Sequence, residues 1–174
     1  PLFILMGALA ARSGLSQELY DAFNAWLGGF RGGRALATVG ACGAFAVICG
    51  SSVATAATMS KVALPEMKKY RYSDSMATGS VAAGGIIGIL IPPSVILVLY
   101  GLLTESSIGD LFIAGFLPGI LTILVFMIVI SIETRLNPES GPAGEKSTWK
   151  QKLNATLKTW AITALFATVI GGIR

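Results

Sequence analysis

Long apolar stretches, separated by short clusters of charge, dominate the hydropathy pattern of this chain. Four of them contain no Asp, Glu, Lys or Arg: residues 35–60, 75–104, 111–132 and 159–173. An α-helix needs about 20 apolar residues to cross the hydrocarbon core of a bilayer. At least two of the stretches are long enough for that. The pattern therefore predicts an all-α integral membrane protein that crosses the lipid bilayer more than once.

Composition and charge support the same class and exclude others. Hydrophobic residues make up 53% of the chain and charged residues only 13%, whereas soluble proteins carry about 25% charged residues. The chain has no His, which removes imidazole acid–base chemistry and the commonest metal ligand. The net charge is +4, and the basic residues lie beside the apolar stretches. This placement is typical of membrane loops rather than of nucleic-acid binding. We expect no enzymatic activity, no bound cofactor and no nucleic-acid partner.

The stretch 35–60 has basic residues on both sides and a small, polar middle around Gly50, Ser51 and Ser52. Because Lys and Arg mark cytoplasmic loops, both of its ends are expected on the cytoplasmic side. A segment that enters and leaves on one side is a re-entrant helical hairpin, here with its turn at these three residues. Non-helical backbone at that depth requires surrounding protein or a water-filled cavity. A plain spanning helix with a polar patch is the alternative.

A second interruption is expected within residues 76–103, where Pro92 and Pro93 are consecutive. Neither proline has an N–H group, so the carbonyls of Gly88 and Ile89 lose their helical donors. Helical backbone angles are also unfavourable for Ile91, because it precedes a proline. We predict a transmembrane helix broken at this point, with a kink absorbed by packing as the alternative. Free carbonyls here and hydroxyls at the hairpin turn are suited to a hard cation.

The rest of the charge pattern divides the chain into shorter segments. A helix within residues 13–34 is amphipathic, with Ser16 as its expected N-cap; it suits either the membrane interface or packing on its own protein. Because the chain lacks an initiator Met and stops inside an apolar stretch, we expect an internal piece of a longer protein. The other expected segments are the end of a transmembrane helix (1–12), a basic cytoplasmic loop (61–75), an acidic periplasmic loop (104–110), a transmembrane helix (111–132), a cytoplasmic linker (133–158) and the start of a truncated transmembrane helix (159–174).

Three blocks of residues resemble a known family: 50–58, 88–94 followed by Tyr100-Gly101, and 107–112 continuing to Pro118-Gly119. In order and spacing they are similar to the N-terminal half of the large membrane (M) subunit of the tripartite ATP-independent periplasmic (TRAP) transporters. The resemblance implies an elevator-type, sodium-driven importer of organic acids in the bacterial inner membrane. It also implies two partners, a periplasmic substrate-binding P subunit and a small membrane Q subunit.

The resemblance further implies a sodium site, with sodium acting as the coupling ion. Carried over to this chain, its positions are Gly50, Ser51, Ser52, Gly88, Ile91 and Pro92. The second hairpin and second sodium site of the family have no counterpart in this sequence. Two other functions stay open. One is a sodium–dicarboxylate carrier that uses no binding protein, and the other is a non-transporting membrane scaffold in which both interruptions are packing features.

Overall fold

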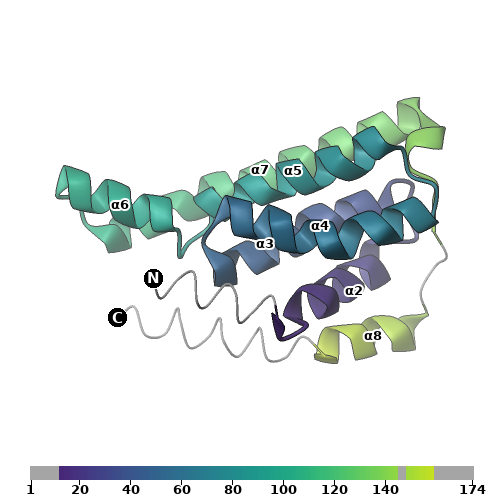
Figure 1. The fold of residues 1–174 in the computed structure, drawn as a ribbon, viewed down its shortest axis with the longest axis horizontal. Helices are drawn as coiled ribbons and strands as arrows, with labels where there is room; N and C mark the ends of the chain where they lie inside the picture. Colours follow the sequence, from purple (N-terminus) through teal and green to yellow (C-terminus); the bar gives the residue numbers. More distant parts are fainter. Residues whose placement is uncertain (1–11, 145–147, 159–174) are drawn as a thin grey trace.

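The structure, a computed structural model, describes residues 12–144 and 148–158, and these are helical with no strand among them (Figure 1). The expected membrane segments at 1–12 and 159–174 lie outside the described residues, apart from residue 12. The helices in chain order are α2 (Leu15–Leu27), α3 (Gly33–Cys49), α4 (Ser52–Lys69), α5 (Asp74–Leu90), α6 (Val95–Thr104), α7 (Ile108–Leu136), the short 3-10 helix η1 (Pro138–Ser140) and α8 (Trp149–Lys158).

Helix α3 forms the centre of the bundle and contacts α2, α4, α5 and α7. Nearly all of its residues are buried, and the side chains of Phe45 and Ile48 are almost fully enclosed. Small residues allow this close packing: a Cβ atom added at Gly84 of α5 would lie 2.6 Å from the Cys42 sulfur. Both cysteines are free and buried. The apolar character of α3 is therefore explained by burial in protein rather than by contact with lipid.

Helix α2 differs from its prediction at the N-terminus. It begins at Leu15 with Gly14 as the N-cap, so Ser16 lies inside the helix and is buried. Gly14 has φ 81°, a left-handed conformation that glycine adopts without strain. The predicted apolar face is buried in the core through Leu19 and Tyr20. Of the two alternatives for α2, the structure therefore supports packing on its own protein.

Two segments that we predicted as loops contain helix. Helix α4 continues to Lys69, so only residues 70–73 of the expected loop 61–75 separate it from α5. The lysines in its last turn suit the negative end of the helix dipole, and charge alone therefore does not indicate a loop there. The expected linker 133–158 contains the end of α7, then η1 and α8. Helix α8 is stabilised by packing on α2, where the Trp26 Nε1–H donates to Thr156 Oγ1 at 3.0 Å.

Three loops meet at one end of the bundle (Figure 1), where Arg31, Arg34 and the basic last turns of α4 and α7 also lie. The N–H of Gly32 donates to the Gly141 carbonyl at 2.9 Å, which joins the α2–α3 loop to the segment after α7. The Tyr72 hydroxyl accepts from the Arg34 N–H at 3.3 Å and donates to the Pro142 carbonyl at 3.0 Å. Burial raises the pKa of Tyr72, which keeps this phenol protonated as a donor. We call this end of the molecule the basic end.

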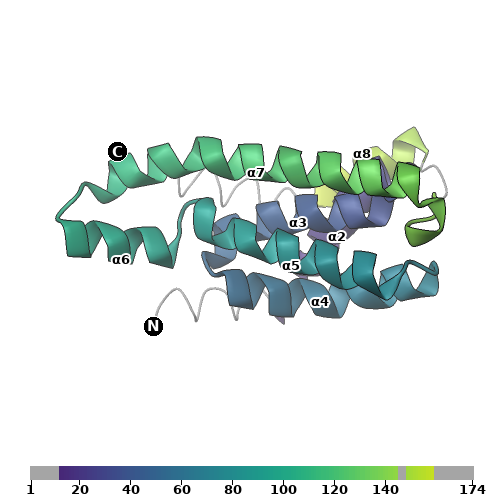
Figure 2. The same cartoon turned by 90° about the horizontal axis from the view of Figure 1, so that it is seen from above.

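At the opposite end, α6 and the first half of α7 form a hairpin that projects beyond the other helices (Figures 1 and 2). Ser107 caps α7, because its Oγ accepts from the Asp110 N–H at 3.4 Å. Much of the hairpin's apolar surface is exposed, including Leu103 at 77% and Ile113 at 76%. Residues Asp74–Thr104, which include both α5 and α6, and helix α7 are each long and apolar enough to cross a membrane.

Candidate functional site

Helices α3 and α4 form a tight hairpin that turns at the predicted position. Gly50 follows the last residue of α3 with φ 59°, and its N–H donates to the Ala46 carbonyl at 2.7 Å. Ser51 is extended and begins α4, since its Oγ accepts from the Ala54 N–H at 3.4 Å. A residue with a Cβ would be strained at the φ of Gly50. The identity of these two residues therefore explains both the end of one helix and the start of the next.

The predicted break between α5 and α6 is confirmed. Ile91 is extended, with φ −84° and ψ 124°, as expected for a residue before proline. Helix α6 then begins at Val95, and Ser94 caps it by accepting from the Leu97 N–H at 3.4 Å. Because prolines 92 and 93 carry no N–H, the carbonyls of Gly88 and Ile89 have no donor from the next turn. The two alternatives are thereby resolved in favour of a full interruption rather than a kink.

The hairpin turn and the helix break contact each other directly. The N–H of Val95 donates to the Gly50 carbonyl at 3.2 Å. A Cβ added at Gly88 would lie 3.1 Å from the carbonyl carbon and oxygen of Ser51 and 3.2 Å from the Ser52 nitrogen. The α5 backbone therefore approaches the turn as closely as a glycine allows. We call residues 50–52 together with 88–94 the tip–break junction.

Helix α7 covers another side of the junction. A Cβ at Gly115 would lie 2.8 Å from the Leu90 carbonyl oxygen, and one at Gly119 would lie 2.7 Å from Cγ1 of Ile91. Of the six residues that the resemblance assigned to a sodium site, Gly50, Ser51, Ser52 and Gly88 belong to the direct contact between turn and break. The Ile91 side chain instead packs against α7. Pro92 is buried within the break.

The junction is rich in uncharged oxygen atoms. The Ser52 hydroxyl makes no hydrogen bond to any other described residue, and neither residues 35–60 nor 75–104 contain a charged side chain. Within the described ranges no cluster of three or more His, Cys, Asp or Glu could hold a metal ion. An ion bound at the junction would therefore have neutral hydroxyl and carbonyl ligands, a set that suits a hard cation.

Two polar residues near the junction were not singled out from the sequence. Ser94 is fully buried and caps α6, a role that its position after two prolines could have indicated. Thr55, one turn after Ser51, is also fully buried, and it lies beside the Cys49 thiol. A threonine in a run of alanines gives no signal of this kind, because only the packing of α4 shows that its hydroxyl is enclosed.

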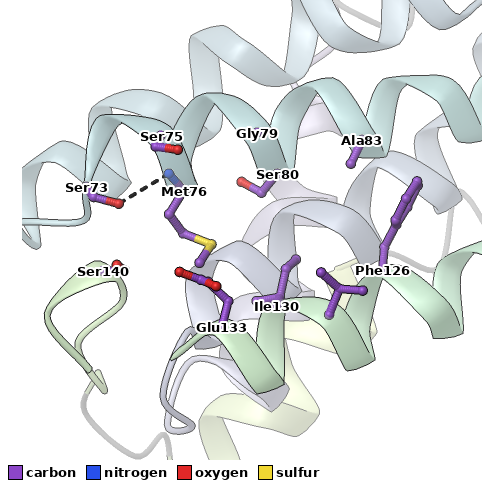
Figure 3. A pocket seen from close by; sticks show the side chains of 11 residues that line it. Ser73, Ser75, Met76, Gly79, Ser80, Ala83, Phe126, Ile130, Glu133 and Ser140 are labelled. Carbon is purple, nitrogen blue, oxygen red and sulfur yellow. Dashed lines mark hydrogen bonds between the residues drawn. The ribbon is translucent and has the colours of Figure 1, made fainter. Parts of the chain in front are cut away.

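A separate cavity of about 370 Å³ lies at the basic end between α5 and α7 (Figure 3). Three of its polar side chains already have local partners. Ser73 accepts from the Met76 N–H at 3.2 Å, Ser80 donates to the Ala77 carbonyl at 3.0 Å, and Glu133 accepts from Asn137 at 2.8 Å. These bonds stabilise helix ends and turns, so the tip–break junction remains the better candidate for function.

Comparison with known proteins identifies the class of molecule. The family model "Tripartite ATP-independent periplasmic transporter, DctM component" matches residues 1–174. A C4-dicarboxylate TRAP transporter large permease protein of Pseudomonas aeruginosa is 39% identical, over 99% of this chain and 40% of its own length. A sialic acid TRAP transporter permease of Haemophilus influenzae is 33% identical, over 99% of this chain and 28% of its own length.

An ectoine TRAP transporter large permease of Halomonas elongata is 32% identical, over 99% of this chain and 40% of its own length. This chain thus spans less than half the length of each of these curated relatives. These relatives are named as permeases. The match over the whole sequence agrees with the helical fold and its two membrane-length apolar segments. The chain belongs to the DctM family, the large permease component of TRAP transporters.

Proposed function

We propose that this chain is part of a sodium-coupled secondary transporter that imports organic acids across the bacterial inner membrane. The observation that carries the proposal is the contact between the α3–α4 turn and the α5–α6 break. Interrupted helices that meet within the membrane are a recurring way for secondary transporters to bind coupling ions. In this proposal a periplasmic binding protein delivers the acid, and a small membrane subunit completes the complex.

The proposed ion site uses oxygen atoms that the fold leaves without donors. The Gly88 and Ile89 carbonyls lose their helical donors to the two prolines, and the Ser52 hydroxyl has no hydrogen bond to another described residue. The Gly50 carbonyl accepts one bond from Val95 and, like any carbonyl, has a second lone pair. Sodium would satisfy such groups without placing a carboxylate inside the membrane, where an unpaired charge is costly.

The proposed topology makes α3 and α4 a re-entrant hairpin. Basic residues lie at its base, at the start of α3 and in the last turn of α4. The loop between α6 and α7 instead carries Glu105 and is followed by Asp110. The basic end would then face the cytoplasm and the α6–α7 loop the periplasm. With 17 residues and a rise of about 1.5 Å per residue, α3 is long enough to place its turn deep in the bilayer. Movement of this hairpin with α5 would constitute the elevator step.

Cysteine labelling of the complete protein tests this topology. We expect Arg31→Cys and Lys61→Cys, made in a background lacking Cys42 and Cys49, to react only with reagent applied from the cytoplasmic side. Glu105→Cys should react only from the periplasmic side, which provides the opposite control. Labelling of positions 31 and 61 from different sides would make α3 and α4 a spanning segment and would rule out the re-entrant hairpin.

Uptake by proteoliposomes tests the function. The complete large subunit, reconstituted with its small membrane subunit, should accumulate an acid such as succinate only with an inward sodium gradient and added binding protein. A proton gradient of equal size serves as the control. Uptake without the binding protein would favour a sodium–dicarboxylate carrier. Absence of uptake for every acid, with binding of the acid by the binding protein verified, would favour a scaffold.

A further inference from the structure

A groove of about 650 Å³ runs along α7 beside the loop between α2 and α3. It is separate from the tip–break junction and lies toward the basic end. The backbone of the loop lies against α7: the Thr134 Oγ1, which donates to the Ile130 carbonyl at 2.9 Å, is 3.5 Å from the Arg31 carbonyl oxygen. The contact is close, since a Cβ at Gly32 would lie 2.6 Å from Cγ2 of Thr134. The α2–α3 loop and the end of α7 therefore form one continuous wall.

The long side of the groove is apolar and exposed. Leu124, Ile128 and Ile132 follow one another at a spacing of four along α7, with exposed fractions of 51%, 57% and 52%. At a rise of about 1.5 Å per residue this row is about 12 Å long. Phe30, 62% exposed, adds an aromatic side chain from the α2–α3 loop. The shape and chemistry fit an extended hydrocarbon chain lying against the helix.

Two arginines line the groove at its basic end. Arg31 comes from the α2–α3 loop, and Arg135 from the last turn of α7. Both are exposed, and neither forms an ion pair with a carboxylate among the residues that the structure describes. A guanidinium group presents paired N–H donors that match a phosphate group. The groove thus combines a site for an anionic head with a site for an apolar tail.

We propose that this groove binds an anionic phospholipid, with its phosphate held by Arg31 and Arg135 and one acyl chain along Leu124, Ile128 and Ile132. Basic pockets beside membrane helices on the cytoplasmic side are suited to anionic headgroups, because they add charge attraction to the burial of the chain. The bound lipid would brace the end of α7 against the α2–α3 loop at the N-terminus of α3. This role is independent of ion binding at the tip–break junction.

Native mass spectrometry of the complete, delipidated transporter tests the proposal with dioleoylphosphatidylglycerol as the probe and dioleoylphosphatidylcholine as the neutral comparison. We expect one phosphatidylglycerol to bind with clear preference. The double variant Arg31→Gln, Arg135→Gln should weaken that binding about tenfold or more. The matched control removes two other exposed basic charges, Lys61→Gln with Lys68→Gln on α4, and should leave the affinity unchanged. Glycerol phosphate, which has the head but no chain, should not displace the lipid.

Photocrosslinking identifies what occupies the groove in a membrane. A photoreactive amino acid at position 128 should crosslink to phosphatidylglycerol in vesicles that contain it. A crosslink to the small membrane subunit, or to another segment of the large subunit, would show that protein covers the groove and would overturn the proposal. Equal affinity for the two lipids would also overturn it. So would displacement by glycerol phosphate, or a loss of phosphatidylglycerol affinity in the α4 control as large as that in the double arginine variant.

Discussion

Replacing Ser52 with alanine in the complete transporter is expected to raise the sodium concentration needed for half-maximal uptake about tenfold or more. The substitution removes a hydroxyl that has no hydrogen bond to another described residue, so the fold loses little. Loss of one charge-assisted contact costs about 1.5–3 kcal/mol, and about 1.4 kcal/mol corresponds to a factor of ten in affinity. This sodium concentration is obtained by measuring the uptake rate at increasing sodium concentrations with saturating substrate.

Two further substitutions examine the same site from the turn and from the break. Ser51→Ala should also raise the sodium requirement, but it removes the N-cap of α4 and should cost about 1 kcal/mol of stability as well. Pro92→Ala restores an N–H at position 92, which can bond to the Gly88 carbonyl and withdraw it from the ion.

The matched control is Ser60→Ala on α4, where the hydroxyl donates to the Ala57 carbonyl away from the turn. It should leave the sodium requirement unchanged. If Ser51→Ala, Ser52→Ala and Pro92→Ala all keep the original sodium dependence, the junction is a packing feature and the ion site should be abandoned.

Gly88→Ala is expected to abolish most sodium-dependent uptake and to lower the stability of the protein by about 1–3 kcal/mol. The new Cβ would lie 3.1 Å from the Ser51 carbonyl group and 3.2 Å from the Ser52 nitrogen. These are backbone atoms, so they cannot move aside as the end of a flexible side chain can. The bond from Val95 to the Gly50 carbonyl holds the same turn in place. The methyl group would therefore separate the turn from the break.

Gly79→Ala is the matched control for this variant. It places the same methyl group on the same helix, where a Cβ meets nothing within 4 Å. Alanine favours a helix over glycine by about 0.5–1 kcal/mol, so this variant should be as stable as the parent or slightly more stable, with normal uptake. Thermal unfolding in detergent together with uptake in proteoliposomes separates the two outcomes. Equal behaviour of the two variants would mean that the close approach at Gly88 has no functional role.

Several features of the fold follow from local chemistry and could be predicted from the sequence. Two adjacent prolines remove N–H donors, which breaks a helix wherever they occur. A glycine followed by serine ends one helix and caps the next. The predicted hairpin turn at Gly50 and the predicted break after Leu90 are both present for these reasons. The apolar stretches likewise indicated the helical class and the membrane-length segments.

Segment boundaries follow less directly from the sequence, because charged residues occur on helices as well as in loops. The lysines near the end of α4 and in α8 lie on helices, where a helix surface or a helix end accommodates them. Ser16 was expected as an N-cap, but it is buried inside α2. In each of these places the packing of one helix on another decides the result, and hydropathy along a single segment does not contain that information.

By itself, the sequence determined where the helices are interrupted, because missing N–H groups and missing Cβ atoms act within a few residues. The family resemblance implied that the two interruptions meet, but physically only the tertiary structure decides it. Val95 bonds to Gly50 and Gly88 lies against Ser51, although these residues are far apart along the chain. That contact depends on how α3, α4, α5 and α7 pack around small residues. Such packing is a property of several helices at once, and this is the physical reason that no local pattern predicts it.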